Sequence, residues 1–260
     1  DIYRSDYVNG AWQDPVELGA SINTYSGEDE PSFSQDGSVM YYQSWEGDWK
    51  SLGGPYYTAR NENGTWKKTG SMGASINKFF TEKSEKGFGY ATDGMAVSAN
   101  GKIFIVACGE NYDGAMDLYY SLKTETGWTY PKIMGISTEG DERSVFIAGD
   151  NRTIYYSSDG MGGFGGLDIF ISKFDASGNF VWAKNLAHPV SQSPLSSCRA
   201  TSVAVDIFGN IYTTGNFIDT VDFDPSIGNY NLIGDHFGDA FICKLDAAGN
   251  FKWAKPFYGN

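Results

Sequence analysis

The stretch TIYYSSDGMGGFGGLDIFISKFDASGNFVW, residues Thr153 to Trp182, decides the fold. Its first part, Thr153–Ser158, alternates and is rich in β-branched and aromatic residues, which is typical of a strand. A glycine loop at 160–166 separates it from a second alternating segment, Asp168–Phe174. Residues 176–179 have the composition of a tight turn and lead into a third strand. The stretch therefore predicts three consecutive antiparallel strands.

Imperfect copies of the last two of these strands recur along the chain. Each copy has a short strand, a glycine turn and a tryptophan, and the tryptophans are Trp12, Trp66, Trp128, Trp182 and Trp253. Another hairpin precedes four of the copies, at residues 32–44, 96–107, 144–158 and 202–214. Four antiparallel strands per repeat are typical of a β-propeller blade. We therefore expect the tryptophans to pack at equivalent positions, one in each blade.

The repeats predict an all-β protein, a β-propeller of four-stranded antiparallel blades with four complete blades and a half blade. The half blade is expected at residues 1–18 and the blades at about 28–69, 92–131, 141–184 and 199–255. No amphipathic helix of useful length is predicted. An unpaired outer hairpin leaves a ragged sheet edge, which proteins normally avoid. We therefore expect a longer polypeptide, in which an inner hairpin upstream of Asp1 or downstream of Asn260 completes a ring of five or more blades.

Composition excludes several classes of function. The net charge of -13 and the absence of a basic stripe oppose binding to nucleic acid. No apolar run approaches the roughly 20 residues that cross a bilayer, so no membrane insertion is expected. Three widely separated cysteines, Cys108, Cys198 and Cys243, are expected to be buried thiols without a metal role.

Antiparallel pairing places the long connections at one end of the blades, which we call the long-loop face. Function concentrates in loops that a rigid scaffold carries. Six aromatic residues map to these connections and are the predicted contacts for a protein or glycan partner: Trp45, Trp49, Phe79, Phe80, Tyr112 and Phe164. The alternative is that the loops fold back and bury their own aromatic rings.

Two acidic groups are candidates for further chemistry. Asp219, Asp222 and Asp224 lie close together in a long loop and could bind calcium, although an Asp-Pro turn explains the same residues; no other cofactor is expected. Four carboxylates are expected near the mouth of the central channel: Glu28, Glu30, Asp141 and Glu142. Paired carboxylates can do acid–base work on glycosides. A structural role is the alternative for them.

Several segments carry a resemblance to known repeat families. Residues 18–23, 28–37 and 157–170 resemble the PD40, or WD40-like, β-propeller repeats of TolB and of OmpA-linked envelope proteins. Residues 174–184, 204–215, 221–225 and 239–250 resemble the SBBP propeller repeats of secreted bacterial surface proteins. The resemblance implies PD40-type repeats for about residues 1–174 and SBBP-type repeats for about 175–260. It also implies an extracellular or cell-surface location, with the periplasm as the alternative.

Together these observations predict a non-catalytic binding or scaffolding propeller of a secreted or envelope-associated bacterial protein. Its protein or glycan partner is expected on the long-loop face. One alternative is a glycoside-active five-bladed enzyme that uses the carboxylates at the channel mouth. Another is a structural spacer in a large surface protein. Propellers host both enzymes and inert platforms, so the fold itself decides nothing here.

Overall fold

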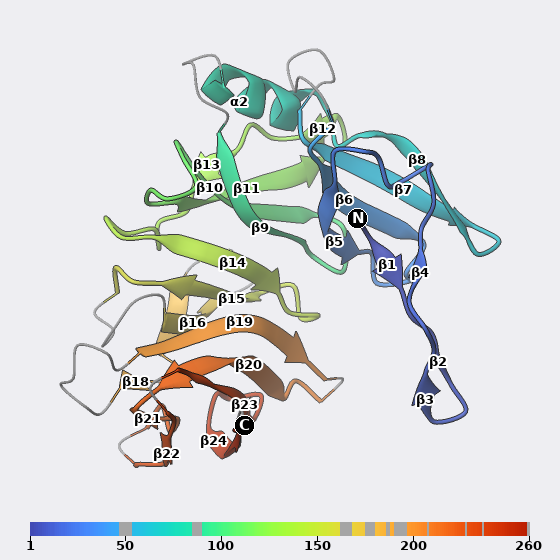
Figure 1. The fold of residues 1–260 in the computed structure, drawn as a ribbon. Helices are drawn as coiled ribbons and strands as arrows, with labels where there is room; N and C mark the ends of the chain where they lie inside the picture. The colour runs from blue at the N-terminus through green and yellow to red at the C-terminus, as the bar shows by residue number, and fades with distance from the viewer. Residues whose placement is uncertain are drawn as a thin grey trace.

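The structure is a computed structural model that describes residues 1–46, 54–84, 90–161, 168–174, 180–185, 188–189, 197–206, 208–226, 228–235 and 237–258. Antiparallel β-sheets follow one another along an arc from the N-terminus to the C-terminus (Figure 1). The protein is therefore all-β in class. Among the described residues, none of the helical structure is long and apolar enough to cross a membrane.

The four large sheets share one meandering topology, in which consecutive strands pair in the order of the sequence. The first contains β5 (Glu28–Phe33), β6 (Val39–Ser44), β7 (Tyr56–Glu62) and β8 (Thr65–Ser71). The second contains β9 (Ala91–Val97), β10 (Ile103–Gly109), β11 (Asp117–Thr124), β12 (Gly127–Trp128) and β13 (Lys132–Ile133), and both short strands pair with β11. The third contains β14 (Glu142–Ile147), β15 (Thr153–Ser158), β16 (Asp168–Phe174) and β17 (Phe180–Asn185). The fourth contains β19 (Ser197–Val205), β20 (Ile211–Ile218), β23 (Asp239–Leu245) and β24 (Phe251–Phe257).

Three smaller sheets complete the described strands. The N-terminal ribbon, residues 1–17, pairs β1 (Tyr3–Arg4) with β4 (Val16–Glu17) and β2 (Tyr7–Val8) with β3 (Ala11–Trp12). A three-stranded sheet joins β18 (His188–Pro189), β21 (Thr220–Asp222) and β22 (Asn231–Ile233). Two of its strands lie within residues 216–238, the long connection between β20 and β23. This connection forms a small folded unit beside the fourth sheet.

The turn residues explain why the hairpins form where they do. The ribbon turns at Asn9 and Gly10, and the first sheet turns at Asn63 and Gly64, each with positive φ at both residues. Two-residue hairpin turns need this conformation because it matches the twist of the flanking strands, and Asn-Gly adopts it at little cost. These two turns therefore fix the register of the hairpins on either side of them.

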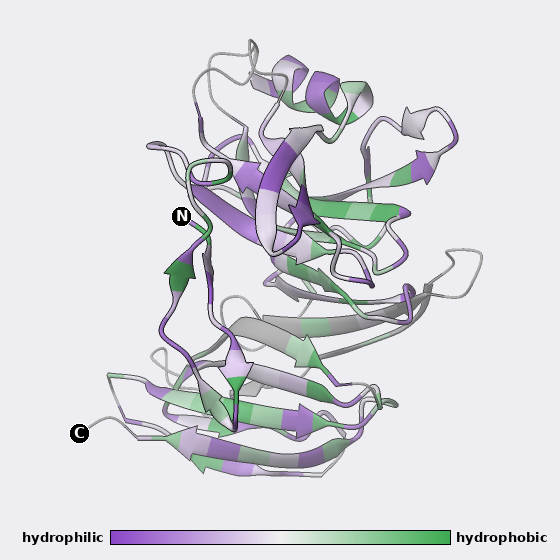
Figure 2. Ribbon diagram, turned by 90° about the vertical axis from the view of Figure 1, so that its right-hand side faces the viewer, coloured by the Kyte–Doolittle hydropathy of each residue, from purple (hydrophilic) through white to green (hydrophobic). Residues whose placement is uncertain are grey.

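The hydrophobic core lies between neighbouring sheets. Apolar and polar segments alternate along the strands (Figure 2), and the apolar faces meet in separate clusters. Ile105 and Leu118 of the second sheet, for example, pack with Tyr156 of the third. The expectation of buried thiols is confirmed for all three cysteines, and burial raises the pKa of Cys243 to about 12. Burial likewise raises the pKa of Cys108, so the Cys108 and Cys243 thiols remain protonated parts of the core.

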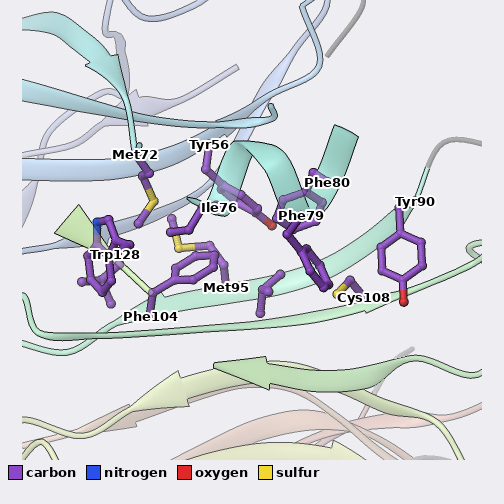
Figure 3. Close-up of a cluster of buried hydrophobic side chains, with 12 residues drawn as sticks. Tyr56, Met72, Ile76, Phe79, Phe80, Tyr90, Met95, Phe104, Cys108 and Trp128 are labelled. Atoms are coloured by element: carbon purple, nitrogen blue, oxygen red, sulfur yellow. The ribbon is translucent and has the colours of Figure 1, made fainter. Parts of the chain in front are cut away.

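A helix, α2 (Ala74–Ser84), covers the junction of the first two sheets, where we predicted a loop and no helix. Its buried residues Ile76, Phe79 and Phe80 have the spacing that places side chains on one helical face. Figure 3 shows this face against Tyr56, Phe104 and other core residues. The prediction that Phe79 and Phe80 are exposed partner contacts is therefore wrong. They belong to the core because the helix places both rings against residues of the first two sheets.

The tryptophans are not equivalent, contrary to our expectation. Trp66 and Trp128 are buried. Trp66 packs in the cluster that contains Ile2 and Ile22, and Trp128 packs in the cluster that contains Tyr56 of the first sheet. Trp12 is 71% exposed, and its ring lies 5.1 Å from that of Tyr7 in its own ribbon, in a tilted arrangement. Trp253 is partly exposed, and the side chain of Trp182 lies outside the described residues. Trp12 is exposed because its ribbon has no inner strands and no sheet in front of it among the described residues.

We predict that Phe79→Ala destabilises the protein by about 3–5 kcal/mol, the usual cost of removing a fully buried aromatic ring. Phe79 loses ring contacts with Phe80, Tyr90, Tyr119 and Tyr130. Urea unfolding followed by tryptophan fluorescence measures the change. The exposed Lys78→Ala on the same helix is the control and is expected to cost less than about 0.5 kcal/mol. A cost below about 1 kcal/mol for Phe79→Ala would contradict the packing of α2.

Candidate binding site at the bulged ends of the inner strands

The first strand of each large sheet contacts the first strand of the next, so β5, β9, β14 and β19 are the inner strands of the arc. In β5, β9 and β14 the pairing register skips at the same place, near the start of the strand. The residue at each skip has positive φ: 53° at Glu30, 94° at Gly94 and 53° at Ser144. Each inner strand therefore begins with a β-bulge, and a bulge redirects the neighbouring side chain.

The three bulges lie against one another. The Gly94 amide donates a hydrogen bond of 2.6 Å to Glu30 Oε1 of the preceding inner strand. On the other side, a Cβ added to Gly94 would lie only 2.8 Å from the Cα of Ser144. Glycine is required at this position because both its φ and its distance from β14 exclude a side chain. The bulges consequently hold the three inner strands in direct contact.

The residue before each bulge is charged: Asp29, Asp93 and Arg143 occupy equivalent positions in the three strands. Arg143 joins these strands electrostatically. Its Nη1 lies 3.1 Å from Asp93 Oδ2, and its Nε lies 2.6 Å from Asp141 Oδ2. Burial lowers the pKa of Arg143, but its bonds with Asp141 and Asp93 outweigh burial, so the pKa is raised above its usual value. We call these residues, together with Glu30, the carboxylate–arginine cluster.

Arg143 also fixes the long loop between β10 and β11. Its Nη2 donates to the carbonyl oxygens of Tyr112 at 2.6 Å and Gly114 at 3.1 Å. The guanidinium carbon lies 5.1 Å from the centre of the Tyr112 ring, within the range of a cation–π contact. Asp141 Oδ1 accepts from the Met116 amide at the end of the same loop. The loop is therefore held in place while the Tyr112 side chain remains 59% exposed.

On the other side of the cluster, Trp45 is held by Asp29. The indole Nε1 donates to Asp29 Oδ2 at 3.3 Å, and 41% of the tryptophan is exposed. Partial burial raises the pKa of Asp29, and the nearby charges of Glu28 and Asp93 add to this effect. Trp45 and Tyr112 thus stand beside one group of charges, and both belong to the long-loop face.

Glu30 lies beneath these residues. Besides the Gly94 amide, it accepts a hydrogen bond of 3.1 Å from the Tyr56 hydroxyl. Burial raises the pKa of Glu30 to about 7, and the charges of Asp29 and Asp93 act in the same direction. Glu30 therefore changes its ionisation near neutral pH, in the middle of the contact between β5 and β9.

The expected carboxylates at the channel mouth divide into two pairs. Glu30 and Asp141 belong to the cluster, whereas Glu28 and Glu142 are buried and bonded elsewhere. Glu28 accepts from the amide and hydroxyl of Thr24 and from the Ser44 hydroxyl. Glu142 makes the same three bonds with Thr138 and Ser158. Glu28 and Glu142 therefore have the structural role given as the alternative, because both anchor the loop that enters their strand.

Of the six predicted aromatic contacts, the structure brings Trp45 and Tyr112 to the cluster and buries Phe79 and Phe80. Trp49 and Phe164 lie outside the described residues. Sequence inspection missed Asp29, Asp93 and Arg143. A detectable signal exists for them, since aligning the starts of the inner strands places EDE at 28–30, TDG at 92–94 and ERS at 142–144 in one column.

The predicted calcium ligands turn toward their own loop. Asp222 Oδ1 accepts from the amides of Asp224 and Tyr230, and Asp224 Oδ1 accepts from the Ser226 amide. Asp219 Oδ1 accepts from the Thr220 amide. Within the described residues, no three His, Cys, Asp or Glu side chains form a group that could hold a metal ion. These carboxylates stabilise turns, as the alternative interpretation expects.

Comparison with known families identifies one short segment. The sequence model of the SBBP β-propeller repeat matches residues 193–216, which include much of β19 and β20. The SBBP resemblance is therefore confirmed at those residues. No curated protein matches the chain in sequence.

Several solved propeller-type structures are similar to this chain at low identity. TolB from Acinetobacter baumannii is 13% identical, with 94% of this chain and 57% of TolB covered and a TM-score of 0.47. An endo-arabinase from Bacteroides thetaiotaomicron is 10% identical, with 89% and 94% covered and a TM-score of 0.44. The β-propeller domain of the Trilobed protease from Pyrococcus furiosus is 11% identical, with 90% and 58% covered and a TM-score of 0.38. This chain thus spans just over half the length of TolB.

We predict that Gly94→Ala costs about 2 kcal/mol more stability than Gly27→Ala. Both glycines have similar positive φ, 94° and 97°, and the strain of that conformation is about 1–2 kcal/mol for alanine. Only at Gly94 does the new methyl group meet a neighbouring strand, because nothing lies within 4 Å of a Cβ at Gly27. Thermal and urea unfolding of the two variants measure the difference. Equal costs would show that the inner strands are not in close contact.

We also predict that Glu30 makes stability depend on pH. Because the folded chain holds a proton that the unfolded chain has released, the free energy of unfolding falls as pH rises from about 4.5 to about 7. Glu30→Gln keeps an acceptor for the Gly94 amide and should remove a fall on the order of 2 kcal/mol. Urea unfolding at a series of pH values tests this. The exposed Glu139→Gln should keep the wild-type slope, and an unchanged slope in Glu30→Gln would refute the role of Glu30.

Proposed function

We propose that this chain is a non-catalytic binding module of β-propeller architecture, with the four large sheets as blades and the N-terminal ribbon as a half blade. Its partner binds at the carboxylate–arginine cluster on the long-loop face. The observation that carries this proposal is the arrangement of Trp45 and Tyr112. Both rings stay substantially exposed, yet each is oriented by a charged neighbour, Asp29 or Arg143. Fixed exposed rings lose little entropy when they bind a ligand.

Glycans are the class of partner that the chemistry of the cluster supports best. Aromatic ring faces offer apolar surface to the C–H groups of a sugar, and adjacent carboxylates accept hydrogen bonds from its hydroxyls. Three aspartates, Asp29, Asp93 and Asp141, outnumber the one guanidinium of Arg143. This local excess of negative charge, together with the net charge of -13, favours neutral glycans over polyanionic ones. A protein partner would use the same two rings as anchors.

A second candidate is the glycoside-active enzyme, which the pKa of Glu30 favours. A carboxylic acid with a pKa of about 7 beside Asp29 has the ionisation that a general acid needs. Binding remains the better-supported function because both oxygens of Glu30 already accept hydrogen bonds from the protein. Asp141 is engaged in the same way by Arg143 and the Met116 amide. Neither group is directed to a substrate.

The PD40 resemblance of the first part of the chain and the SBBP match of residues 193–216 support a bacterial secreted or envelope-associated setting for this module. In that setting we propose an extracellular or cell-surface location, with the periplasm as the alternative. A cell-surface glycan is then the available partner. The location is open to direct measurement by fractionating cells that express the native protein and detecting it with an antibody.

We predict that the chain binds neutral oligosaccharides and that Trp45→Ala and Tyr112→Ala each weaken binding by about tenfold or more. Isothermal titration against a panel of neutral and sulfated oligosaccharides measures the affinities. Phe208→Ala is the control, because Phe208 is an exposed ring in the turn before β20, at the other end of the strands. It should leave binding unchanged.

The same panel separates the alternatives. Release of new reducing ends, abolished by Glu30→Gln, would indicate the enzyme. Failure of every oligosaccharide to bind would refute glycan recognition and leave a protein partner or a spacer. Equal effects of Phe208→Ala and Tyr112→Ala would show that binding occurs away from the cluster.

A further inference from the structure

One position in the inner strands differs in exposure between the first sheet and the next two. Phe33 of β5, Val97 of β9 and Ile147 of β14 are equivalent, because each pairs with the second residue of the strand that follows it in its sheet. Val97 and Ile147 are 4% and 6% exposed because the preceding sheet covers them. Phe33 is 45% exposed. Within the part of the chain that the structure describes, no inner strands of a sheet preceding the first one cover Phe33.

The N-terminal ribbon supplies the outer part of that preceding sheet. Ile2 exchanges backbone hydrogen bonds with the Asn23 side chain, through its amide at 2.9 Å and its carbonyl at 3.0 Å. In the second sheet, the amide and carbonyl of Leu118 in β11 bond in the same way with the hydroxyl of Ser137. Ile2 therefore occupies the place of a residue in the third strand of a sheet.

Strand β1, which follows Ile2 directly, lacks the neighbouring strand that its counterpart β11 has. In the second sheet, β11 pairs with β10 from Asp117 to Leu122, and Leu118 lies opposite Ala107. In the ribbon, β1 and β2 pair only with β4 and β3 within the described part of the chain. Ile2 and Asp6 direct their carbonyls to the ribbon's other strand. Because backbone groups alternate in direction along a strand, Tyr3 and Tyr7, each the next residue along, direct theirs to the open edge.

An open edge of this kind pairs readily with another strand. The ribbon carries five exposed apolar residues, Tyr3, Tyr7, Val8, Trp12 and Val16. It extends from the first sheet to the level of the fourth sheet in both views (Figures 1 and 2). Its base already packs on the first sheet, since Ile2 and Leu18 contact the cluster that contains Met40, Tyr42 and Trp66. A partner at the open edge would extend this existing interface.

We propose that the edge formed by residues 1–8, together with Phe33, is the docking site of a β-hairpin from outside residues 1–260. The hairpin is of the same type as the inner hairpins of this chain, such as residues 142–158. Its outer strand pairs antiparallel with β1 and β2, and its apolar face covers Phe33. In the second sheet the corresponding residues that face the next sheet are Ala96, Ile105 and Ala107. The docked strands therefore carry small or branched apolar residues at alternate positions.

The test uses chain 1–260 and a fluorescently labelled peptide of residues 142–158. We expect saturable binding by fluorescence anisotropy, and slower hydrogen exchange of the Tyr3 and Tyr7 amides by about tenfold or more when the peptide is bound. Phe33→Asp should weaken binding by about tenfold or more. Leu122→Asp is the matched control, because Leu122 is 44% exposed in β11 and away from the ribbon, and it should change binding by less than about twofold.

Two further experiments distinguish a docked hairpin from other molecules that could bind at this edge. The peptide with Tyr155→Pro loses a backbone donor in its second strand and should not bind. Absence of saturable binding by the unmodified peptide, or equal binding by Phe33→Asp, would overturn the proposal. So would a dimer in sedimentation velocity that Tyr7→Pro dissociates, since a second copy of the chain would then occupy the edge. Glycan binding at Trp45 and Tyr112 is measured separately and does not depend on this result.

Discussion

Close contact between the bulges of the inner strands is the constraint on which the rest of this structure depends. Gly94 must approach Ser144 closely enough to exclude a Cβ, and its amide must reach Glu30. Without the bulge, the residue before it would continue the regular alternation of the strand. With it, Asp29, Asp93 and Arg143 come to the same end of the arc. A backbone irregularity repeated in three sheets thus creates a single polar cluster from residues far apart in the sequence.

The sequence predicts the fold correctly where short-range patterns, such as turn residues and apolar alternation, determine the structure. Asn-Gly turns and alternating apolar residues mark the hairpins in the sequence, and the structure places strands at both. The helix α2 was not predictable in this way. The same six-residue pattern occurs at 18–23 and 72–77, yet only the second copy continues as a helix. Thr24 and Gly27 end the first copy, whereas Phe79 and Phe80 extend the second because they can be buried between two sheets.

The candidate site shows a similar division. Trp45 and Tyr112 could be assigned to the long-loop face because antiparallel connectivity decides which end a loop belongs to. Their partners Asp29 and Arg143 could not, because a charged residue at the start of a strand is common and only its position relative to the bulge is unusual. Exposure of loop aromatics is also a tertiary property. Phe79 is as aromatic as Tyr112, and only the neighbouring sheets distinguish them.

The hydrogen bonds of the cluster limit what it can recognise. Asp141 and Glu30 use both of their oxygens on the protein, and Arg143 uses its donors on two carboxylates and two carbonyls. A ligand that displaced these bonds would leave buried polar groups unpaired, which costs about 1–3 kcal/mol for each. A ligand that leaves this hydrogen-bond network intact and contacts the two rings avoids this free-energy cost. For the proposed binding function, discrimination would therefore depend mainly on the shape and apolar surface that the ligand presents to Trp45 and Tyr112, which the charged groups keep in place.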